Sequence, residues 1–173
     1  LKERHLPENC RETINTILKE TYGYEQFRNL EIYDDLSKGK EKLCISQGQL
    51  IENVILEAEK AWKGETQVDN ILLTAPTGSG KSLLFQLPAI YLGKEYNLLT
   101  IVVSPLKALI VDQVESLQEL GYMRVAYASS DLSPEQKMEV YRQVREGEID
   151  LFYLSPELLL SYDIKHFVGE RRI

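Results

Sequence analysis

The chain has 173 residues, of which 43% are hydrophobic and 27% charged, and its formal net charge is −7. These values are ordinary for a globular protein with one sizeable core, and the net acidity argues against a broad basic surface. No apolar run reaches the roughly 18 residues that span a bilayer, so we expect a cytoplasmic protein. Cys10 and Cys44 stand far apart and outside any metal-binding pattern, so we expect free thiols.

The first third of the chain predicts two helices separated by a loop. "ENCRETINTILKETYG" (8–23) predicts an amphipathic helix, with Asn9 and Glu12 spaced as a capping box and Gly23 as its stop. The charged segment "NLEIYDDLSKGKEK" predicts a loop, because its glycine and clustered charges break any period. Apolar residues at helical spacing predict a second helix over 49–62. We therefore expect a helical extension over 1–46 and the main domain over 47–173.

From residue 70 onward, apolar strand-like runs alternate with helical segments. The predicted strands are "NILLTA", "LLTIVVS", "RVAYAS" and "IDLFYLS", all expected to be buried on both faces. The predicted helices cover 81–92, 106–120 and 134–146, the last with Ser133 and Gln136 as a capping box. The core stripe of the middle helix is predicted to be Leu109, Ile110, Val114, Leu117 and Leu120. This alternation is typical of an α/β domain with a parallel sheet.

The segment "APTGSGKS", Ala75 to Ser82, fits a phosphate-binding loop with alanine in place of the first glycine. Gly78 and Gly80 allow the backbone to curl so that its N–H groups face phosphate oxygens. Lys81 would reach the β and γ phosphates, and the Ser82 hydroxyl would ligate magnesium. The predicted nucleotide-binding residues are Thr77, Gly78, Ser79, Gly80, Lys81 and Ser82, with Lys81 and Ser82 in catalytic roles.

Further blocks in order carry a family resemblance. "GKSLLFQLPA" is similar to motif I of RecQ-like superfamily two helicases, "VVSPLKALIVDQV" (102–114) resembles motif Ia, and "LFYLSPELL" (151–159) resembles motif Ib. "ASSDLSPEQ" between them also resembles the RecQ-like segment. The resemblance covers about residues 70 to 160. It implies a RecA-like P-loop NTPase fold, ATP with magnesium as cofactors, and a DNA helicase or translocase driven by ATP hydrolysis.

Two Ser-Pro pairs end predicted strands, at Ser104-Pro105 and Ser155-Pro156. They place polar groups at the carboxyl edge of the sheet, where α/β proteins bind ligands, although each pair is also an ordinary turn with a helix cap. A helix beginning near Leu106 would offer its amides to a strand phosphate beside Lys107. With the resemblance, we predict backbone contacts to single-stranded DNA from Ser104, Pro105, Leu106, Lys107, Ser155, Pro156 and Glu157.

RecQ-like proteins read adenine through a segment upstream of motif I. "YGYEQFRNLE" supplies Tyr24, Phe27 and Arg28, but Glu31 stands where the resemblance requires glutamine. "SQGQLIENVI" offers Gly48 and Gln49 in a similar setting. We interpret the segment as split by an insertion, with Gln49 as the candidate for the adenine edge. The alternative is a surface glutamine at a helix start, and the preference for ATP over GTP rests on the resemblance.

These 173 residues contain neither an Asp-Glu-x-His nor an Asp-Glu-Ala-Asp box, nor a second RecA-like domain. The chain also begins without methionine and ends at "GERRI". We therefore expect an incomplete RecA-like domain whose partner is the rest of a parent helicase, and which hydrolyses ATP poorly alone. Two other hypotheses stay open: a P-loop enzyme acting on a small molecule, and a nucleotide-sensing module without catalysis.

Overall fold

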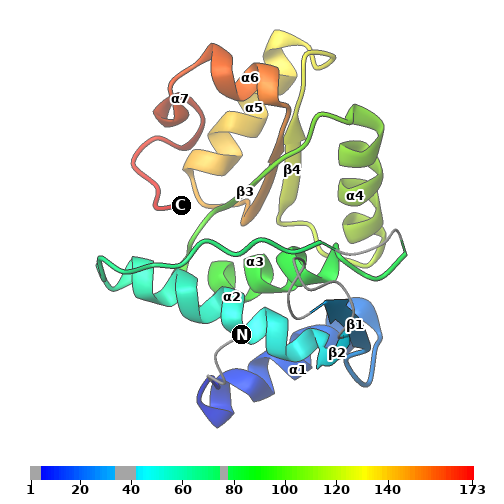
Figure 1. The fold of residues 1–173 in the computed structure, drawn as a ribbon. Coiled ribbons are helices and arrows are strands. Elements are labelled where there is room, and N and C mark those ends of the chain that lie inside the picture. Colours follow the sequence, from blue (N-terminus) through cyan, green and yellow to red (C-terminus); the bar gives the residue numbers. More distant parts are fainter. Residues whose placement is uncertain (1–4, 34–41, 75–77) are drawn as a thin grey trace. The chain divides into compact units, whose positions relative to one another are not determined.

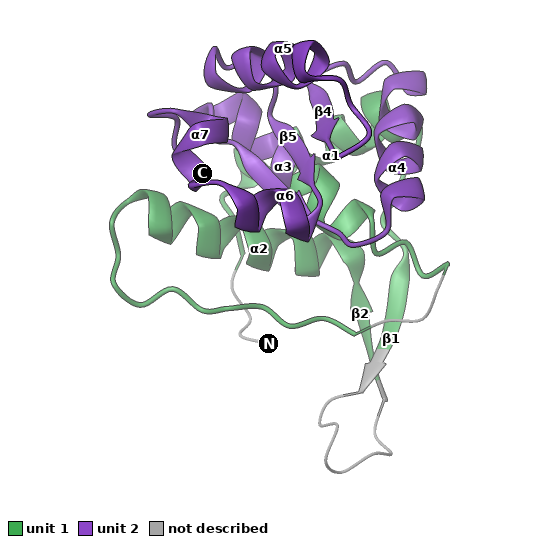
Figure 2. Ribbon diagram, turned by 90° about the horizontal axis from the view of Figure 1, so that it is seen from above, with its two compact units in different colours: residues 1–88 green, residues 89–173 purple. Residues whose placement is uncertain are grey.

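The computed structural model describes residues 5–33, 42–74 and 78–173. The chain forms two compact units, residues 1–88 and residues 89–173 (Figure 2). In the described part of the chain, no helix combines the length and the apolar character that a membrane crossing needs.

The first unit opens with helix α1 (Glu8–Tyr22), whose buried face consists of Ile14, Ile17 and Leu18. Gly23 ends the helix in the left-handed region at φ +69°, as predicted. The predicted capping box is wrong. The helix begins directly after Pro7, no side chain of the described residues caps it, and Asn9 already lies in the first turn. The fixed φ of Pro7 and the Glu8 carboxylate near the helix N-terminus favour this earlier start.

A β-hairpin replaces the loop expected after α1. Strands β1 (Asn29–Tyr33) and β2 (Lys42–Ser46) pair antiparallel, from Asn29 opposite Ser46 to Tyr33 opposite Lys42. Leu30 faces Ile45 across the pair and both are buried, so a short alternating pattern anchors the hairpin. The loop prediction gave more weight to the charges and glycine of 34–41, which lie outside the described residues.

Helix α2 (Gln47–Trp62) follows the hairpin without a connecting loop. It starts two residues before the predicted position, because the Ser46 hydroxyl caps it by accepting a hydrogen bond from the Gly48 N–H at 3.2 Å. Ile51 and Ile55 are fully buried, as the helical pattern predicts, whereas Trp62 at the end is 40% exposed. The apolar pattern therefore identifies the helix but overestimates the burial of its last turn.

The strand predicted at "NILLTA" is absent from the described part of this segment. Residues 70–74 have no regular secondary structure, and Leu72 is 88% exposed. None of the described strands pairs with this segment, and a strand without a partner leaves its backbone groups unsatisfied. Helix α3 (Leu83–Tyr96) then begins two residues later than predicted and is buried almost all round through residue 93.

The second unit is built on a parallel sheet of three strands in the order β3-β5-β4. Its strands are β3 (Thr100–Val103), β4 (Val125–Ala128) and β5 (Leu151–Leu154), and its helices after α3 are α4 (Lys107–Glu119), α5 (Pro134–Arg145), α6 (Pro156–Ser161) and α7 (Ile164–Val168). The parallel sheet between helices confirms the predicted α/β class (Figure 1). The capping box of α5 is also confirmed, with Ser133 and Gln136 bonded reciprocally.

The core of the second unit lies where α5 and α7 pack on one face of the sheet (Figure 1). The members of this core are Leu99, Ala126, Ala128, Tyr141, Val144, Ile149, Phe152, Leu154, Phe167 and Val168. The central strand β5 is buried along its whole length, as predicted. The prediction that every strand is buried is wrong for β3, which is half-buried over residues 100–102 and exposed at Val103, at 45%, whereas β4 at the other edge of the sheet is largely buried.

Two members of the core stripe predicted for α4 are wrong. Ile110, Val114 and Leu117 are buried, but Leu109 is 46% and Leu120 47% exposed. Positions four and three residues apart share one helix face, and Leu109 lies about 100° off that face. Leu120 is the first residue after the helix, and it lies one position before residue 121, where the spacing of 110, 114 and 117 would next repeat.

Candidate functional site

The loop over residues 78–82, called the phosphate loop below, curves as its glycines require. Gly78 and Gly80 have φ of +81° and +78°, a region that other residues rarely adopt. The backbone carbonyl of Lys81 accepts from the Leu84 N–H at 3.0 Å and that of Ser82 from the Gln86 N–H at 2.9 Å, so both residues lead directly into α3. The predictions for Ala75 and Thr77 fall outside the described residues.

Ser79 contributes the clearest sign that the phosphate loop is built to hold a group. Its Oγ is buried and has no hydrogen-bond partner among the described residues. A buried hydroxyl without a partner is rare in proteins, and a bound water or ion is one of its explanations. The curled backbone and this unsatisfied donor together fit a phosphate.

The hairpin brings together the two halves of the split adenine segment. Asn29 pairs with Ser46 at the base of the hairpin, and the Gln47 N–H donates to the Arg28 carbonyl at 2.9 Å. A Cβ on Gly48 would come within 2.7 Å of the Phe27 ring, so this glycine allows the ring to lie against the start of α2. Residues 24–28 and 47–49 therefore form one continuous element in space, called the base segment below.

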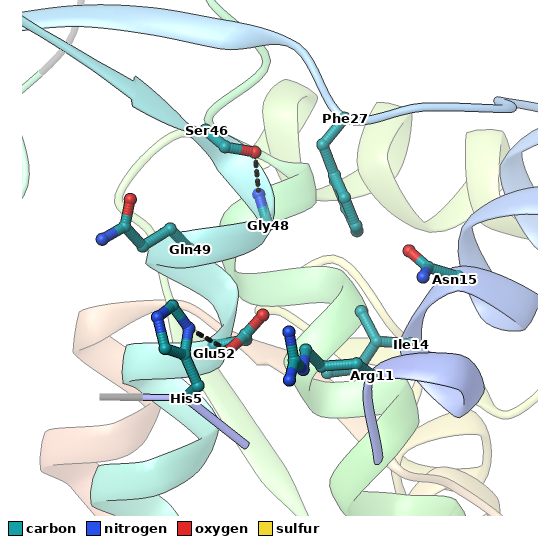
Figure 3. A pocket seen from close by; sticks show the side chains of 9 residues that line it. All are labelled: His5, Arg11, Ile14, Asn15, Phe27, Ser46, Gly48, Gln49 and Glu52. Atoms are coloured by element: carbon teal, nitrogen blue, oxygen red, sulfur yellow. Dashed lines mark hydrogen bonds and ion pairs between the residues drawn. The ribbon is translucent and has the colours of Figure 1, made fainter. Parts of the chain in front are cut away.

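A pocket of about 430 Å³ opens beside the base segment (Figure 3). Phe27, Ser46, Gly48 and Gln49 line it from the base segment and the end of β2, while the other lining residues are His5, Arg11, Ile14, Asn15 and Glu52. Glu52 is held in place, because its carboxylate accepts from the Leu6 N–H at 3.2 Å and lies 3.5 Å from His5 Nδ1. The sequence prediction found Phe27, Gly48 and Gln49 but missed the groups that α1 and Glu52 supply.

The other candidates of the adenine segment lie outside this pocket. Tyr24 is 48% exposed, and the Arg28 guanidinium lies 5.8 Å from the centre of its ring. Glu31, which stands at the expected glutamine position, pairs with Cys44 in the hairpin. Gln49 and Phe27 line the pocket, whereas Tyr24, Arg28 and Glu31 are not among its lining residues.

In the second unit, the two Ser-Pro pairs meet at the carboxyl edge of the sheet. The Ser104 N–H donates to the Leu154 carbonyl at 3.1 Å, so Ser104 and Ser155 end neighbouring strands as predicted. Both hydroxyls also serve locally: Ser104 Oγ accepts from the Leu106 N–H at 3.4 Å and Ser155 Oγ from the Leu158 N–H at 3.3 Å. Ser155 is only 3% exposed, which leaves little of it open to a ligand.

Lys107 is the first residue of α4 and is exposed together with Pro105 and Leu106. Its Nζ donates to Ser130 Oγ at 2.6 Å and to Asp131 Oδ1 at 2.8 Å. The hydrogen bond from Lys107 lowers the pKa of the Asp131 carboxyl. The pKa of Glu157 is lowered by its own backbone N–H and the Ser155 hydroxyl, with a smaller contribution from the charge of Lys107.

Ser130 and Asp131 were not predicted as site residues. They belong to "ASSDLSPEQ", a block that the sequence resemblance singled out without assigning it a role. The signal was therefore present, but the pairing with Lys107 spans 24 residues and no local pattern predicts it.

These features define a class of protein. The DEAD/DEAH box helicase family matches residues 47–171, and the chain belongs to this family. The match, the parallel sheet and the curled phosphate loop confirm the predicted P-loop fold.

The chain is also similar to individual RecQ proteins, which confirms the RecQ-like resemblance. It is 32% identical to the ATP-dependent DNA helicase RecQ of Synechocystis over 94% of this chain and 27% of that protein. The RecQ of Bacillus subtilis is 32% identical over 86% of this chain and 20% of its own length. Mouse ATP-dependent DNA helicase Q4 is 39% identical over 52% of this chain and 7% of its own length. The chain thus spans about a quarter or less of these relatives.

Proposed function

We propose that this chain is the ATP-binding part of an ATP-dependent DNA helicase or translocase, which couples ATP hydrolysis to movement on nucleic acid. The observation that carries the proposal is the phosphate loop, where two glycines with positive φ flank a buried Ser79 hydroxyl that has no partner among the described residues. In the proposal, residues 1–46 are an extension of a RecA-like domain that starts at residue 47. We also propose a cytoplasmic location and the rest of the parent chain as partner.

Lys81 and Ser82 carry the catalytic roles in this proposal. Lys81 would neutralise charge on the β and γ phosphates, and the Ser82 hydroxyl would hold magnesium, as in other phosphate loops. The described residues contain no cluster of three His, Cys, Asp or Glu side chains suited to a metal ion, so the phosphates would supply the other ligands. Bound ATP supplies the phosphoanhydride bond whose cleavage drives movement.

Gln49 is the proposed contact to the base. It lines the pocket beside the base segment, and its amide can both donate and accept, which suits the adenine edge. The pocket volume of about 430 Å³ lies within the range of small-molecule sites. This assignment makes ATP, rather than GTP, the preferred nucleotide.

For nucleic acid, we propose backbone contacts at the carboxyl edge of the sheet. Among the described residues, no side chain caps the N-terminus of α4, so its first N–H groups could bind a strand phosphate beside the exposed Lys107. The proposed contact residues are Ser104, Pro105, Leu106, Lys107, Ser155, Pro156 and Glu157, acting mainly through backbone atoms. Because such contacts do not read base edges, binding of single-stranded DNA should show little sequence preference.

The experiment is a steady-state ATPase assay of the full-length protein with and without single-stranded DNA. We expect DNA to stimulate hydrolysis, and Lys81→Ala to reduce the stimulated rate by at least about 100-fold, because it removes a charge that stabilises the transferring phosphoryl group. Lys94→Ala is the matched control, since Lys94 is an exposed lysine in α3, the helix that follows the phosphate loop. An ATPase rate that changes neither on addition of single-stranded DNA nor in the Lys81→Ala variant would refute the proposal.

A further inference from the structure

Gln47, the first residue of α2, connects the base segment to the phosphate loop. Its side chain is buried, with 2% of the residue exposed. The Oε1 atom accepts from the Arg28 N–H at 3.1 Å, and Nε2 lies 3.4 Å from the carbonyl oxygens of both Ser79 and Gly80, to which it donates. One amide thus spans the two elements that are proposed to hold opposite ends of the nucleotide.

The surroundings of Gln47 are shaped for this amide. A Cβ on Gly80 would come within 2.5 Å of Nε2. Glycine at this position therefore allows both the positive φ and the close approach of the Gln47 amide. The Arg28 N–H requires an acceptor at the Oε1 position, and the carbonyl oxygens of Ser79 and Gly80 require a donor at the Nε2 position. Glutamine meets both requirements, whereas glutamate has no donor and would set a carboxylate against two carbonyl oxygens.

We propose that Gln47 is a positioning residue that fixes the distance between the base segment and the phosphate loop. Gln47 precedes Gly48 and Gln49 directly, so its bonds to Ser79 and Gly80 set where the base contact lies relative to the phosphate cradle. A ligand that engages both ends needs this distance to be held, whereas a ligand that engages the phosphate loop alone does not. The inference rests on the proposed function, because it assumes that a nucleotide spans the two elements.

The test compares Gln47→Ala and Gln47→Glu with Gln118→Ala, an exposed glutamine on α4, in the full-length protein. Loss of the bridging hydrogen bonds should raise KM for ATP about 10-fold with little change in kcat, and Gln47→Glu should be the more affected variant. Inorganic tripolyphosphate, which lacks a base, serves as a competitive inhibitor. Its inhibition constant should rise by less than about 3-fold.

Three results would overturn the inference. ATP and tripolyphosphate could weaken equally, which would mean that Gln47 only shapes the phosphate loop. Both Gln47 variants could match Gln118→Ala in KM and tripolyphosphate inhibition, which would mean that the bridge carries no energy. Finally, kcat could fall as much as KM rises, together with a lower melting temperature, as expected for a general structural role. In each case the wild-type protein still hydrolyses ATP; a wild type without ATPase activity would instead refute the proposed function.

Discussion

The phosphate loop of the first unit and the sheet edge of the second unit differ in whether their polar side chains have hydrogen-bond partners. In the phosphate loop, the Ser79 hydroxyl is buried and has no partner among the described residues. At the sheet edge, the groups of the two Ser-Pro blocks bond within the unit: Lys107 holds Asp131, and Ser155 caps α6. The proposed phosphate site thus contains a hydroxyl without a partner among the described residues, whereas a phosphate at the sheet edge would compete with the Asp131 carboxylate for Lys107.

This difference has a consequence for the proposed motor. Among the described residues, the buried Ser79 hydroxyl has no partner that an anion would have to displace, so nucleotide binding should depend strongly on the shape of the loop. A strand phosphate that approaches Lys107 meets the negative charge of Asp131, so binding at the sheet edge should be weak and sensitive to that one carboxylate. The predictions below test each side of the comparison, beginning with the interior of the second unit.

The largest effect is expected from Asp150→Ala, which breaks the most buried ion pair of the second unit. Asp150 is bonded by Arg124 Nε at 2.6 Å, Arg171 at 3.2 Å and the Tyr122 hydroxyl at 3.0 Å. The side chain of Arg171 is only 5% exposed, so the variant leaves a buried cation without its carboxylate. We expect a loss of about 3–5 kcal/mol in the free energy of unfolding, measured by urea denaturation.

Asp112→Ala is the control, because Asp112 is an exposed aspartate on α4. It should change the free energy of unfolding by less than about 0.5 kcal/mol. If the two variants were equally stable, the interior of the second unit would not depend on the pairing of Asp150 with Arg124 and Arg171.

Gly80→Ala should damage the phosphate loop through two separate causes. Alanine is strained at φ +78°, and its Cβ would collide with Gln47 Nε2. Gly64→Ala provides a matched control: Gly64 has φ +80°, but nothing lies within 4 Å of its Cβ position. We expect Gly80→Ala to weaken ATP binding about 100-fold and Gly64→Ala to leave it unchanged, as measured by equilibrium titration with a fluorescent ATP analogue.

The double variant Gly80→Ala with Gln47→Ala separates the two causes. Removing the Gln47 amide relieves the collision but not the backbone strain, so it should restore part of the lost affinity. An effect of Gly80→Ala that is the same with and without Gln47 would show that the collision contributes nothing.

The sequence predicted the elements whose determinants are local. The capping box of α5, the glycine stop of α1 and the phosphate loop glycines all depend on residues within a few positions of one another. Each of these features has the predicted form. The core face of α4 was also predicted in part, since Ile110, Val114 and Leu117 keep a helical spacing.

Local patterns failed at the capping box expected for α1 and at two positions of the α4 stripe, whereas the other failures concern partners that are distant in sequence. The apolar run at 70–74 resembles a buried strand, but strand formation requires a neighbour, and the described strands provide none. The bridge from Gln47 to Gly80 spans 33 residues, so a glutamine at a helix start gave no sign of it. The hairpin was missed for the same reason, because its stability comes from cross-strand pairs such as Leu30 with Ile45.

A moderate effect is expected from Ser133→Ala. The Ser133 hydroxyl accepts from the Gln136 N–H at 3.2 Å, and the Gln136 side chain accepts from the Ser133 N–H at 2.9 Å. Loss of this cap should reduce the free energy of unfolding by about 1 kcal/mol. Ser116→Ala, at an exposed position inside α4, should have a smaller effect in the same urea titration. Equal losses would mean that the cap does not anchor α5 to the second unit.

The smallest effect, and the most direct test of the sheet edge, is Asp131→Asn. The variant keeps the size of the side chain but removes the negative charge that holds Lys107, so a strand phosphate no longer competes with a carboxylate. We expect the full-length protein to bind single-stranded DNA about 3-fold more tightly, because exposed ion pairs are weak. Since Lys107 lowers the pKa of Asp131, the wild-type carboxyl stays ionised throughout the neutral range, and the difference should not change with pH there. Glu119→Gln, which removes an exposed charge at the far end of α4, controls for net charge alone. If both variants strengthened binding equally in fluorescence anisotropy titrations, general repulsion would explain the effect, and the pairing of Lys107 with Asp131 would not control access to the sheet edge.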